Sequence, residues 1–124
     1  MRVISGNYRG KALISPENKK IRPTSDRGKK VIFDTLNSIL IAQKRSFEQM
    51  VIIDLFCGTG ALGIEAMSRG GKKLILIDNC PNALKLASIN CRKLDIKEVK
   101  FLELGFNEIE NTIEPADIIF LDPP

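Results

Sequence analysis

The residues best able to do chemistry form a glycine-rich segment between two acids. Residues 58–63 have the spacing G-x-G-x-x-G, and Asp78 follows at about the distance of an acid that binds ribose hydroxyls. Alone, this pattern predicts a dinucleotide site. Asp54, however, lies just before the glycines, where its carboxylate would repel a pyrophosphate and suit an ammonium group. The spacing therefore favours a ligand with a cationic amino-acid part. The structural alternatives are a turn without a ligand at the glycines and a simple helix cap at Asp78.

A second candidate group is the tripeptide Asp122-Pro123-Pro124, which follows the last apolar run. Open α/β sheets place their reacting groups at the carboxyl ends of strands. Because proline fixes the backbone, the carbonyls of Asp122 and Pro123, with the Asp122 side chain, are suited to accept the exocyclic N–H groups of a base. Such a site would catalyse by positioning a nitrogen against an already activated donor. A turn that merely ends the strand is the structural alternative.

The elements that position these groups are indicated by apolar runs from residue 51 onward. Such runs are typical of strands buried on both faces, and here they predict strands over 51–56, 74–78, 99–104 and 118–121. Helices are predicted over 61–68 and from Pro81, and a short helix or turn within 109–115. Strands that alternate with helices predict βαβ units, and hence an α/β fold with a parallel sheet and helices on both of its sides.

Residues 1–49 are expected to form a basic N-terminal region that precedes a domain over 50–124. Two extended segments, 2–5 and 8–14, flank a turn-forming Gly6-Asn7 and predict a small hairpin. A helix capped by Thr24 or Ser25 should run to about Leu40. Its apolar positions near helical spacing are Val31, Ile32, Leu36 and Ile39.

The charge is distributed unevenly along the chain. Residues 1–50 carry 11 Lys or Arg against 4 Asp or Glu, whereas residues 51–124 carry 8 against 11. A basic arm on a mildly acidic body predicts contact with a phosphate backbone. A solvated, lysine-rich surface is the alternative.

Composition argues against several other classes of protein. Three cysteines (Cys57, Cys80 and Cys91) fit neither a disulfide framework nor a CxxC metal pattern, and the absence of histidine argues against a zinc site or a His-based triad. We expect no metal. No apolar run approaches the length that spans a bilayer, and the start lacks a signal-peptide core. The expected location is a reducing cytoplasm.

The order of several short motifs adds a resemblance. Residues 2–6, 9–11, 22–27, 54–66 and 122–124 occur in the same order as in the bacterial 16S ribosomal RNA guanine-N2 methyltransferases of the RsmD type. The segments at 54–66 and 122–124 match the first and fourth motifs of S-adenosylmethionine-dependent amino-methyltransferases. The Arg-Pro-Thr segment at 22–27 distinguishes this family from other methyltransferases, because many of those share only the glycine motif. The resemblance covers essentially the whole chain and implies a Rossmann-like methyltransferase fold, here with its first four parallel strands.

The resemblance also implies roles for individual residues. It implies that S-adenosyl-L-methionine is bound by Asp54, Phe56, Gly58, Gly60 and Asp78. It implies that methyl transfer to the exocyclic N2 of a guanine depends on Asp122, Pro123 and Pro124. It implies contacts with 16S ribosomal RNA, in an assembling small subunit, from Arg9, Lys11, Arg22, Thr24 and Arg27. The basic hairpin and the segment 22–27 would then lie beside the cofactor and the RNA.

The sequence departs from the family pattern near its end. The family follows Asp-Pro-Pro with Tyr or Phe, whereas nothing follows Pro124, and Leu104 and Gly105 stand where an acid or amide usually faces the adenine. We expect a truncated chain to keep part of cofactor binding, to lose methyl transfer and to self-associate through an apolar edge at 118–121. A full-length protein is expected to be a monomer.

Two other functions fit the residues. One is a different amino-methyltransferase that acts on DNA adenine or protein glutamine. The other is a non-catalytic RNA-binding or cofactor-binding module.

Overall fold

The computed structural model describes residues 1–16, 24–111 and 114–124. The elements follow one another as α1 (Asp26–Ala42), β1 (Val51–Leu55), α2 (Ala61–Ser68), β2 (Lys73–Asp78), α3 (Pro81–Lys93), β3 (Val99–Glu103), the 3-10 helix η1 (Phe106–Asn111) and β4 (Ile118–Leu121). The predicted strands are confirmed to within one residue at each end. The predicted span of α2 is confirmed at both ends.

A four-stranded parallel sheet in the order β3-β2-β1-β4 organises the molecule. The central strand β1 pairs with β2 on one side and with β4 on the other, so that Asp54 lies level with Leu76 and Phe120. Since all four strands are parallel, their carboxyl ends lie at one edge of the sheet. The acids and glycines singled out in the sequence follow or end strands at that edge.

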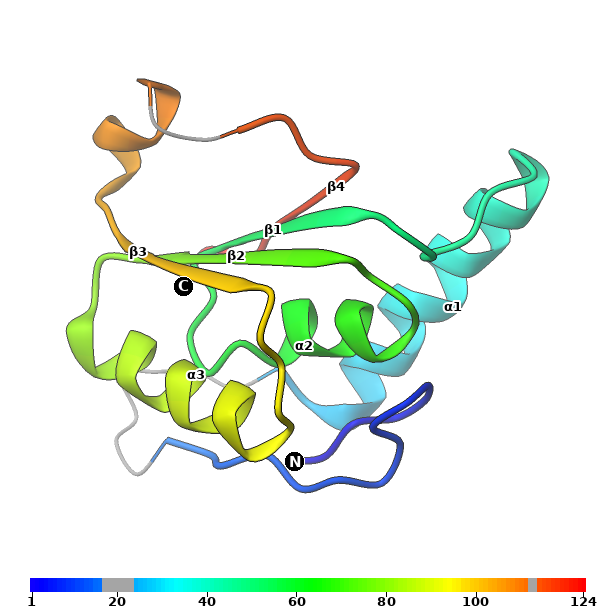
Figure 1. Cartoon of the computed structure of the whole chain (residues 1–124), viewed down its shortest axis with the longest axis horizontal. Helices are drawn as coiled ribbons and strands as arrows, with labels where there is room; N and C mark the ends of the chain where they lie inside the picture. Colours follow the sequence, from blue (N-terminus) through cyan, green and yellow to red (C-terminus); the bar gives the residue numbers. More distant parts are fainter. Residues whose placement is uncertain (17–23, 112–113) are drawn as a thin grey trace.

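The two faces of the sheet are covered differently. Figure 1 shows α2, α3 and the N-terminal segment on one face, and the connection from β3 through η1 to β4 on the other. The larger core cluster joins alternate strand residues, such as Ile52 and Leu76, to the helices. The smaller cluster joins Ile53 and Ile75 to Ile109 of η1. In the described part of the chain, the α-helices expected on both faces therefore lie on one face, and η1 lies over the other.

Helix α1 forms where the sequence predicts a helix. The Ser25 side chain accepts a hydrogen bond from the Gly28 N–H at 3.0 Å and so caps the helix. Phe33 lies against the rings of Phe47 and Phe120, with centroid distances of 5.7 and 5.6 Å. This contact turns one stripe inward, whose buried members are Lys29, Phe33 and Leu40.

Two of the four apolar positions near helical spacing, Val31 and Ile39, lie outside the buried stripe of α1. Their exposed fractions are 61% and 48%. Val31 is two residues from Phe33, about 200° around the helix, and Ile39 is about 100° from Leu40. Ile32 and Leu36 pack partly against the core, as expected. In α3, Leu84, Ala87 and Cys91 form a buried apolar stripe, which the buried C-cap residue Leu94 continues.

The N-terminal hairpin has little regular pairing. One antiparallel bridge joins Arg2 to Ala12, and the turn between them contains Gly6 and Gly10, both with positive φ. Backbone bonds from Val3 N to Lys11 O and from Leu13 N to Met1 O, each 2.9 Å long, hold the two arms together. The hairpin is therefore an irregular loop that lies along the helices.

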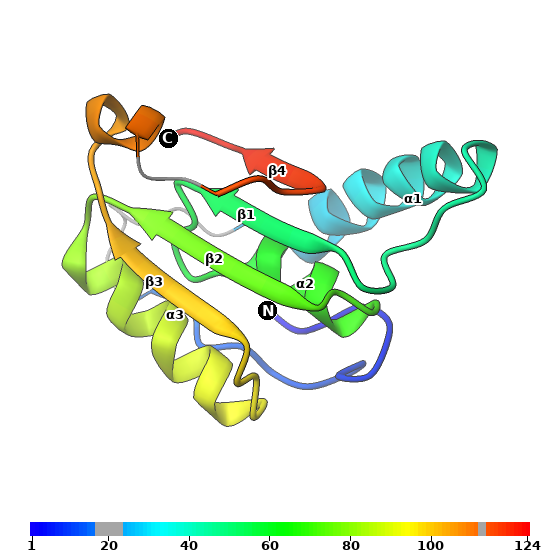
Figure 2. The ribbon, with the colours of Figure 1, turned by 45° about the horizontal axis from the view of Figure 1, so that its top comes forward.

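Strand β4 ends the sheet with an apolar edge. Ile119 and Leu121 are 49% and 60% exposed, whereas Phe120 between them is buried against α1. Figure 2 shows β4 beside β1 with its other side free in the described part of the chain. The exposed edge expected from the sequence is confirmed, and self-association through it stays a prediction. None of the helices in the described residues is both long enough and apolar enough to span a membrane.

Candidate active site

The glycine loop turns its backbone N–H groups inward. The Gly58 N–H donates to Asp78 Oδ2 at 3.0 Å, and the Gly60 N–H donates to the Cys57 carbonyl at 2.8 Å. Gly58 and Gly60 both have positive φ, of 56° and 83°, in the region that favours glycine. Two of the amides that would bind a pyrophosphate in a dinucleotide site are thus already used by the protein.

The third glycine of the motif allows a close approach between α2 and the sheet. A Cβ atom at Gly63 would lie 2.6 Å from Leu74 Cδ1 and 3.3 Å from Asp54 Cβ. The Gly63 N–H donates to Asp54 Oδ2 at 3.0 Å. The loop and the first turn of α2 are therefore held to β1 through a carboxylate.

Asp54 is a buried carboxyl group with little compensation for its charge. Its exposed fraction is 1%. Burial raises the pKa of Asp54 to about 8; the Gly63 N–H bond lowers that pKa, and the negative charges of Asp122 and Asp78 raise it further. None of the ion pairs between described residues includes any of these three acids. A cationic ligand would supply the missing positive charge.

Asp78 connects the glycine loop to the start of α3. Its Oδ2 accepts the Gly58 N–H, and its Oδ1 accepts the Cys80 N–H at 2.9 Å. Cys80 is the N-cap residue of α3 and makes no side-chain capping bond. Asp78 therefore orders both the loop and the helix start, and its half-exposed position leaves part of the carboxylate at the surface.

The Asp122-Pro123-Pro124 tripeptide lies at the same edge of the sheet. Leu121 is the register partner of Leu55, so Asp122 continues β4 beside the point where β1 leads into Phe56. All three residues of the tripeptide are exposed. Their backbone and the Asp122 side chain are thus accessible next to the glycine loop, as the sequence predicts for reacting groups.

Two aromatic rings extend this edge. Phe56 has a positive φ of 56°, and its ring stacks on Phe106 with a centroid distance of 6.3 Å and an interplanar angle of 14°. Phe106 is 68% exposed and, with Asn107, Ile109 and Glu110, lines a hollow of about 350 Å³. Sequence reasoning missed Phe106. Its signal was an aromatic residue three residues after the end of β3, just beyond the expected adenine-facing positions Leu104 and Gly105.

The residues predicted to contact RNA are spread over different parts of the structure. Arg9 and Lys11 belong to the hairpin, whose turn is bonded to Ser68 at the far end of α2. An eight-residue helix is about 12 Å long, and Figure 2 shows this turn at the end of the sheet opposite the strand arrowheads. The turn of the hairpin therefore lies away from the carboxyl ends of the strands, and the expectation that the hairpin lies beside the cofactor and the RNA stays a prediction. RNA contact by Arg9 and Lys11 stays a prediction.

The other expected RNA-contacting residues lie around the start of α1. Thr24 and Arg27 flank the capping residue Ser25, with Arg27 exposed and Thr24 half-buried. Arg22 lies outside the described residues. No group of three or more acidic or cysteine side chains in the described part of the chain is arranged to hold a metal ion.

Residues 1–124 match the protein family described as Conserved hypothetical protein 95. The chain belongs to this family. YlbH from Bacillus subtilis (strain 168) is 34% identical over 131 residues, which cover all of this chain and 66% of YlbH. Ribosomal RNA small subunit methyltransferase D from Escherichia coli (strain K12) is 31% identical over 132 residues, which cover all of this chain and 60% of that protein.

Solved structures give the same relationship. The structure of yhhF from Escherichia coli superposes with a TM-score of 0.83 at 26% identity, and covers all of this chain and 64% of yhhF. The family member described here thus spans between 60% and 66% of the length of these relatives. The parallel sheet and its flanking helices confirm the expected Rossmann-like methyltransferase fold.

Proposed function

We propose that the protein transfers a methyl group from S-adenosyl-L-methionine to the exocyclic N2 of a guanine in 16S ribosomal RNA. The observation that carries the proposal is the cluster of Asp54, Asp78 and Asp122 around an inward-bonded glycine loop. The similarity to ribosomal RNA small subunit methyltransferase D over the whole chain supports the RNA substrate.

The donor set fits S-adenosylmethionine and does not fit a dinucleotide. A pyrophosphate needs free N–H groups and no nearby carboxylates, whereas here Gly58 and Gly63 already donate to Asp78 and Asp54. The charges of a sulfonium and an ammonium group would instead be attracted to Asp54 and its acidic neighbours. The half-exposed carboxylate of Asp78 suits hydroxyl donors such as those of ribose.

The residues of this chain would bind the cofactor and orient the guanine. The cofactor supplies an activated methyl group when it is bound. The glycine loop would hold its amino-acid part, and Asp78 its ribose. Asp122, with the carbonyls that precede each proline, would accept the guanine N–H bonds and so orient N2 toward the donor. Phe56 and Phe106 give this edge a stacked pair of rings, of which Phe106 is exposed and Phe56 half-buried, and a flat group can pack next to the exposed ring.

The proposed setting follows from the substrate. A methyltransferase for 16S ribosomal RNA would act in the bacterial cytoplasm on an assembling small subunit. Arg27 at the start of α1 is exposed and Thr24 is half-buried. An exposed guanidinium would suit a phosphate of the RNA backbone. We propose that residues 22–27 form the main RNA contact near the cofactor.

Calorimetric titration of the chain with S-adenosylmethionine tests the first half of the proposal. We expect binding by the wild type and at least about tenfold weaker binding by Asp78→Ala, because hydrogen bonds to a charged group contribute about 1.5–3 kcal/mol. Glu98→Ala serves as a control, since it removes an exposed acid that precedes β3, away from the carboxyl ends of the strands. Equal affinity of Asp78→Ala and the wild type would show that Asp78 does not hold the ribose.

Nucleoside mass spectrometry tests the second half. An Escherichia coli strain that lacks small subunit methyltransferase D would receive the gene for this protein, read to its stop codon. We expect N2-methylguanosine to return to 16S RNA with the wild-type gene and not with Asp122→Ala. New methyl groups on DNA adenine or protein glutamine, with 16S RNA still unmethylated, would support the other amino-methyltransferase functions instead.

A further inference from the structure

The first 15 residues, here called the N-terminal strap, are attached to the helices through buried polar groups. They lie along the side of α1, α2 and α3 that faces away from the sheet (Figure 1). Three helix residues provide the attachments: Glu65, Ser68 and Asn90. Each of them is at most 1% exposed.

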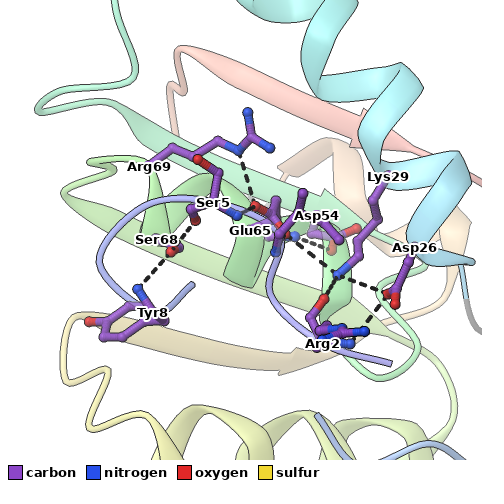
Figure 3. Close-up of polar contacts among 11 residues, drawn as sticks. Arg2, Ser5, Tyr8, Asp26, Lys29, Asp54, Glu65, Ser68 and Arg69 are labelled. Atoms are coloured by element: carbon purple, nitrogen blue, oxygen red, sulfur yellow. Dashed lines mark hydrogen bonds and ion pairs between the residues drawn. The ribbon is translucent and has the colours of Figure 1, made fainter. Parts of the chain in front are cut away.

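The first attachment is a fully buried carboxylate. Glu65 accepts the N–H groups of Ile4 and Ser5 at 2.9 and 3.1 Å. It also forms ion pairs with Lys29 at 3.5 Å and Arg69 at 3.1 Å. Figure 3 shows Glu65 among these partners, with the Lys29 ammonium group also donating to the Arg2 carbonyl. This cluster fixes the start of the strap to both α1 and α2.

The second attachment holds the turn of the strap at the end of α2. Ser68 Oγ donates to the Ser5 carbonyl at 2.6 Å and accepts the Tyr8 N–H at 2.9 Å. Gly6 has a φ of 92°, and a Cβ atom there would lie 2.0 Å from the Ser68 carbonyl oxygen. Any larger residue at position 6 must therefore push the strap away from α2.

The third attachment touches the strap and the glycine loop at once. Asn90 of α3 accepts the Ile14 N–H at 2.7 Å through Oδ1. Its Nδ2 donates to the Ile14 carbonyl at 3.3 Å and to the Thr59 carbonyl at 3.1 Å. Thr59 lies between Gly58 and Gly60, the two glycines with positive φ. One side-chain amide therefore links the end of the strap to the centre of the loop.

We infer that Asn90 is a positioning residue that couples docking of the N-terminal strap to the shape of the glycine loop. With the strap docked, Asn90 uses its oxygen and both amide hydrogens, and its orientation is fixed. Without the strap, two of its three bonds are lost and the amide can rotate away from Thr59. Ligand binding at the loop and docking of the strap then stabilise each other, because such coupling is reciprocal.

The inference deepens the proposed function and rests on it for the identity of the ligand.

A double-mutant cycle tests the coupling with a substitution in the strap, away from the glycine loop. Gly6→Ala loosens the strap at Ser68, and Asn90→Leu removes the link at similar side-chain size. In calorimetry with S-adenosylhomocysteine, we expect Gly6→Ala to weaken binding about tenfold in the wild-type background, within the usual range of coupling between sites. In the Asn90→Leu background the same change should have less than about a twofold effect. Equal effects of Gly6→Ala in both backgrounds would overturn the inference.

Hydrogen exchange without ligand keeps the test independent of the proposed function. We expect Gly6→Ala to speed exchange of the Gly58 and Gly60 amides in the presence of Asn90 and not in Asn90→Leu. Lys93→Ala is the matched comparison, because it removes one exposed bond to the strap at the Ala12 carbonyl, and we expect it to speed loop exchange less than Gly6→Ala does. Failure of the wild type to bind would overturn the proposed cofactor alone, whereas unchanged loop exchange in Gly6→Ala would overturn the coupling.

Discussion

Glu65 and Asp54 are both buried carboxyl groups that contact α2, and they have opposite electrostatic surroundings. Glu65 is fully buried and is surrounded by donors: two backbone N–H groups, the Arg69 guanidinium and the Lys29 ammonium. Asp54 is 1% exposed and accepts one described hydrogen bond, from Gly63, while two further carboxylates lie close enough to raise its pKa. One carboxyl group has partners that the fold supplies, whereas the other, with its pKa raised to about 8, holds a proton unless a cationic ligand displaces it.

The difference separates stability from binding. Removing a partner from a compensated buried ion pair leaves an uncompensated charge, which is strongly destabilising. Removing an uncompensated buried charge relieves the fold and disables the site. Perturbed groups of this second kind are typical of functional sites, and here the distinction depends on the partners, since the two groups are buried to the same extent.

The largest expected effect is the loss of one partner in the Glu65 cluster. Lys29→Met should lower the free energy of unfolding by about 3–5 kcal/mol, because Glu65 then stays buried without its ammonium partner. Urea unfolding measures the change. Lys29→Met combined with Glu65→Leu should recover part of the loss, since the fully buried carboxylate is then gone and the Arg69 side chain, which is 15% exposed, keeps contact with solvent. A double variant less stable than either single variant would show that the strap depends on the charges themselves.

The next effect is a pH dependence caused by Asp54. Its pKa is raised from 3.8 to about 8, so between these values the folded state binds a proton that the unfolded state has lost. Stability therefore falls as the pH rises through this range. From pH 6 to pH 8 the wild type should lose about 2 kcal/mol relative to Asp54→Asn. Urea titrations of both proteins at the two pH values measure this, and parallel curves would contradict the raised pKa.

A related and smaller effect concerns the ligand. A cation that requires ionised Asp54 must displace its proton, so affinity for S-adenosylmethionine should rise with pH up to about 8 and then level off. We expect about a tenfold increase in calorimetric affinity between pH 6.5 and pH 8. Asp54→Asn should bind weakly with little pH dependence. A stronger affinity at the lower pH would mean that the protonated carboxyl is the binding form.

The smallest effect is expected at an exposed ion pair, which serves as a reference for the buried acids Glu65 and Asp54. Lys30 and Asp34 form an ion pair of 2.8 Å on α1, with both side chains more than 60% exposed. Lys30→Ala should change stability by less than about 0.5 kcal/mol, because solvent already screens both charges. Thermal unfolding of this variant beside Lys29→Met compares neighbouring lysines on one helix. Similar losses of stability in the two variants would show that the burial of Lys29 does not make its ion pair more important than an exposed one.

Much of the sheet and of the glycine loop follows from local sequence. The apolar runs of β1 and β2 leave few alternatives to buried strands. The spacing between the glycines and Asp78 predicts that they lie together, and the bond from the Gly58 N–H to Asp78 shows that they do. The face of α1 was not predictable in this way, because apolar residues occur all around that helix and the rings of Phe47 and Phe120 select Phe33.

The buried cluster at Glu65 depends on contacts between distant segments. A lysine such as Lys29 is expected at the surface, and only the packing of the strap against two helices places it inside. Glu65 gave a local signal, as the sole acid in the helix Ala61–Ser68, all of whose residues are buried. Asn90 gave no local signal, because its three hydrogen bonds go to two residues, Thr59 and Ile14, which lie 31 and 76 positions away.

The strap has a consequence for the order of events during synthesis. Its residues are made before the helices that hold it, and the Ile14 N–H binds Asn90, which is added 76 residues later. At roughly 5–20 residues per second, the strap must wait about 4–15 s for the helix that receives it. The strap is therefore made before α3 but can dock only after α3 has been made.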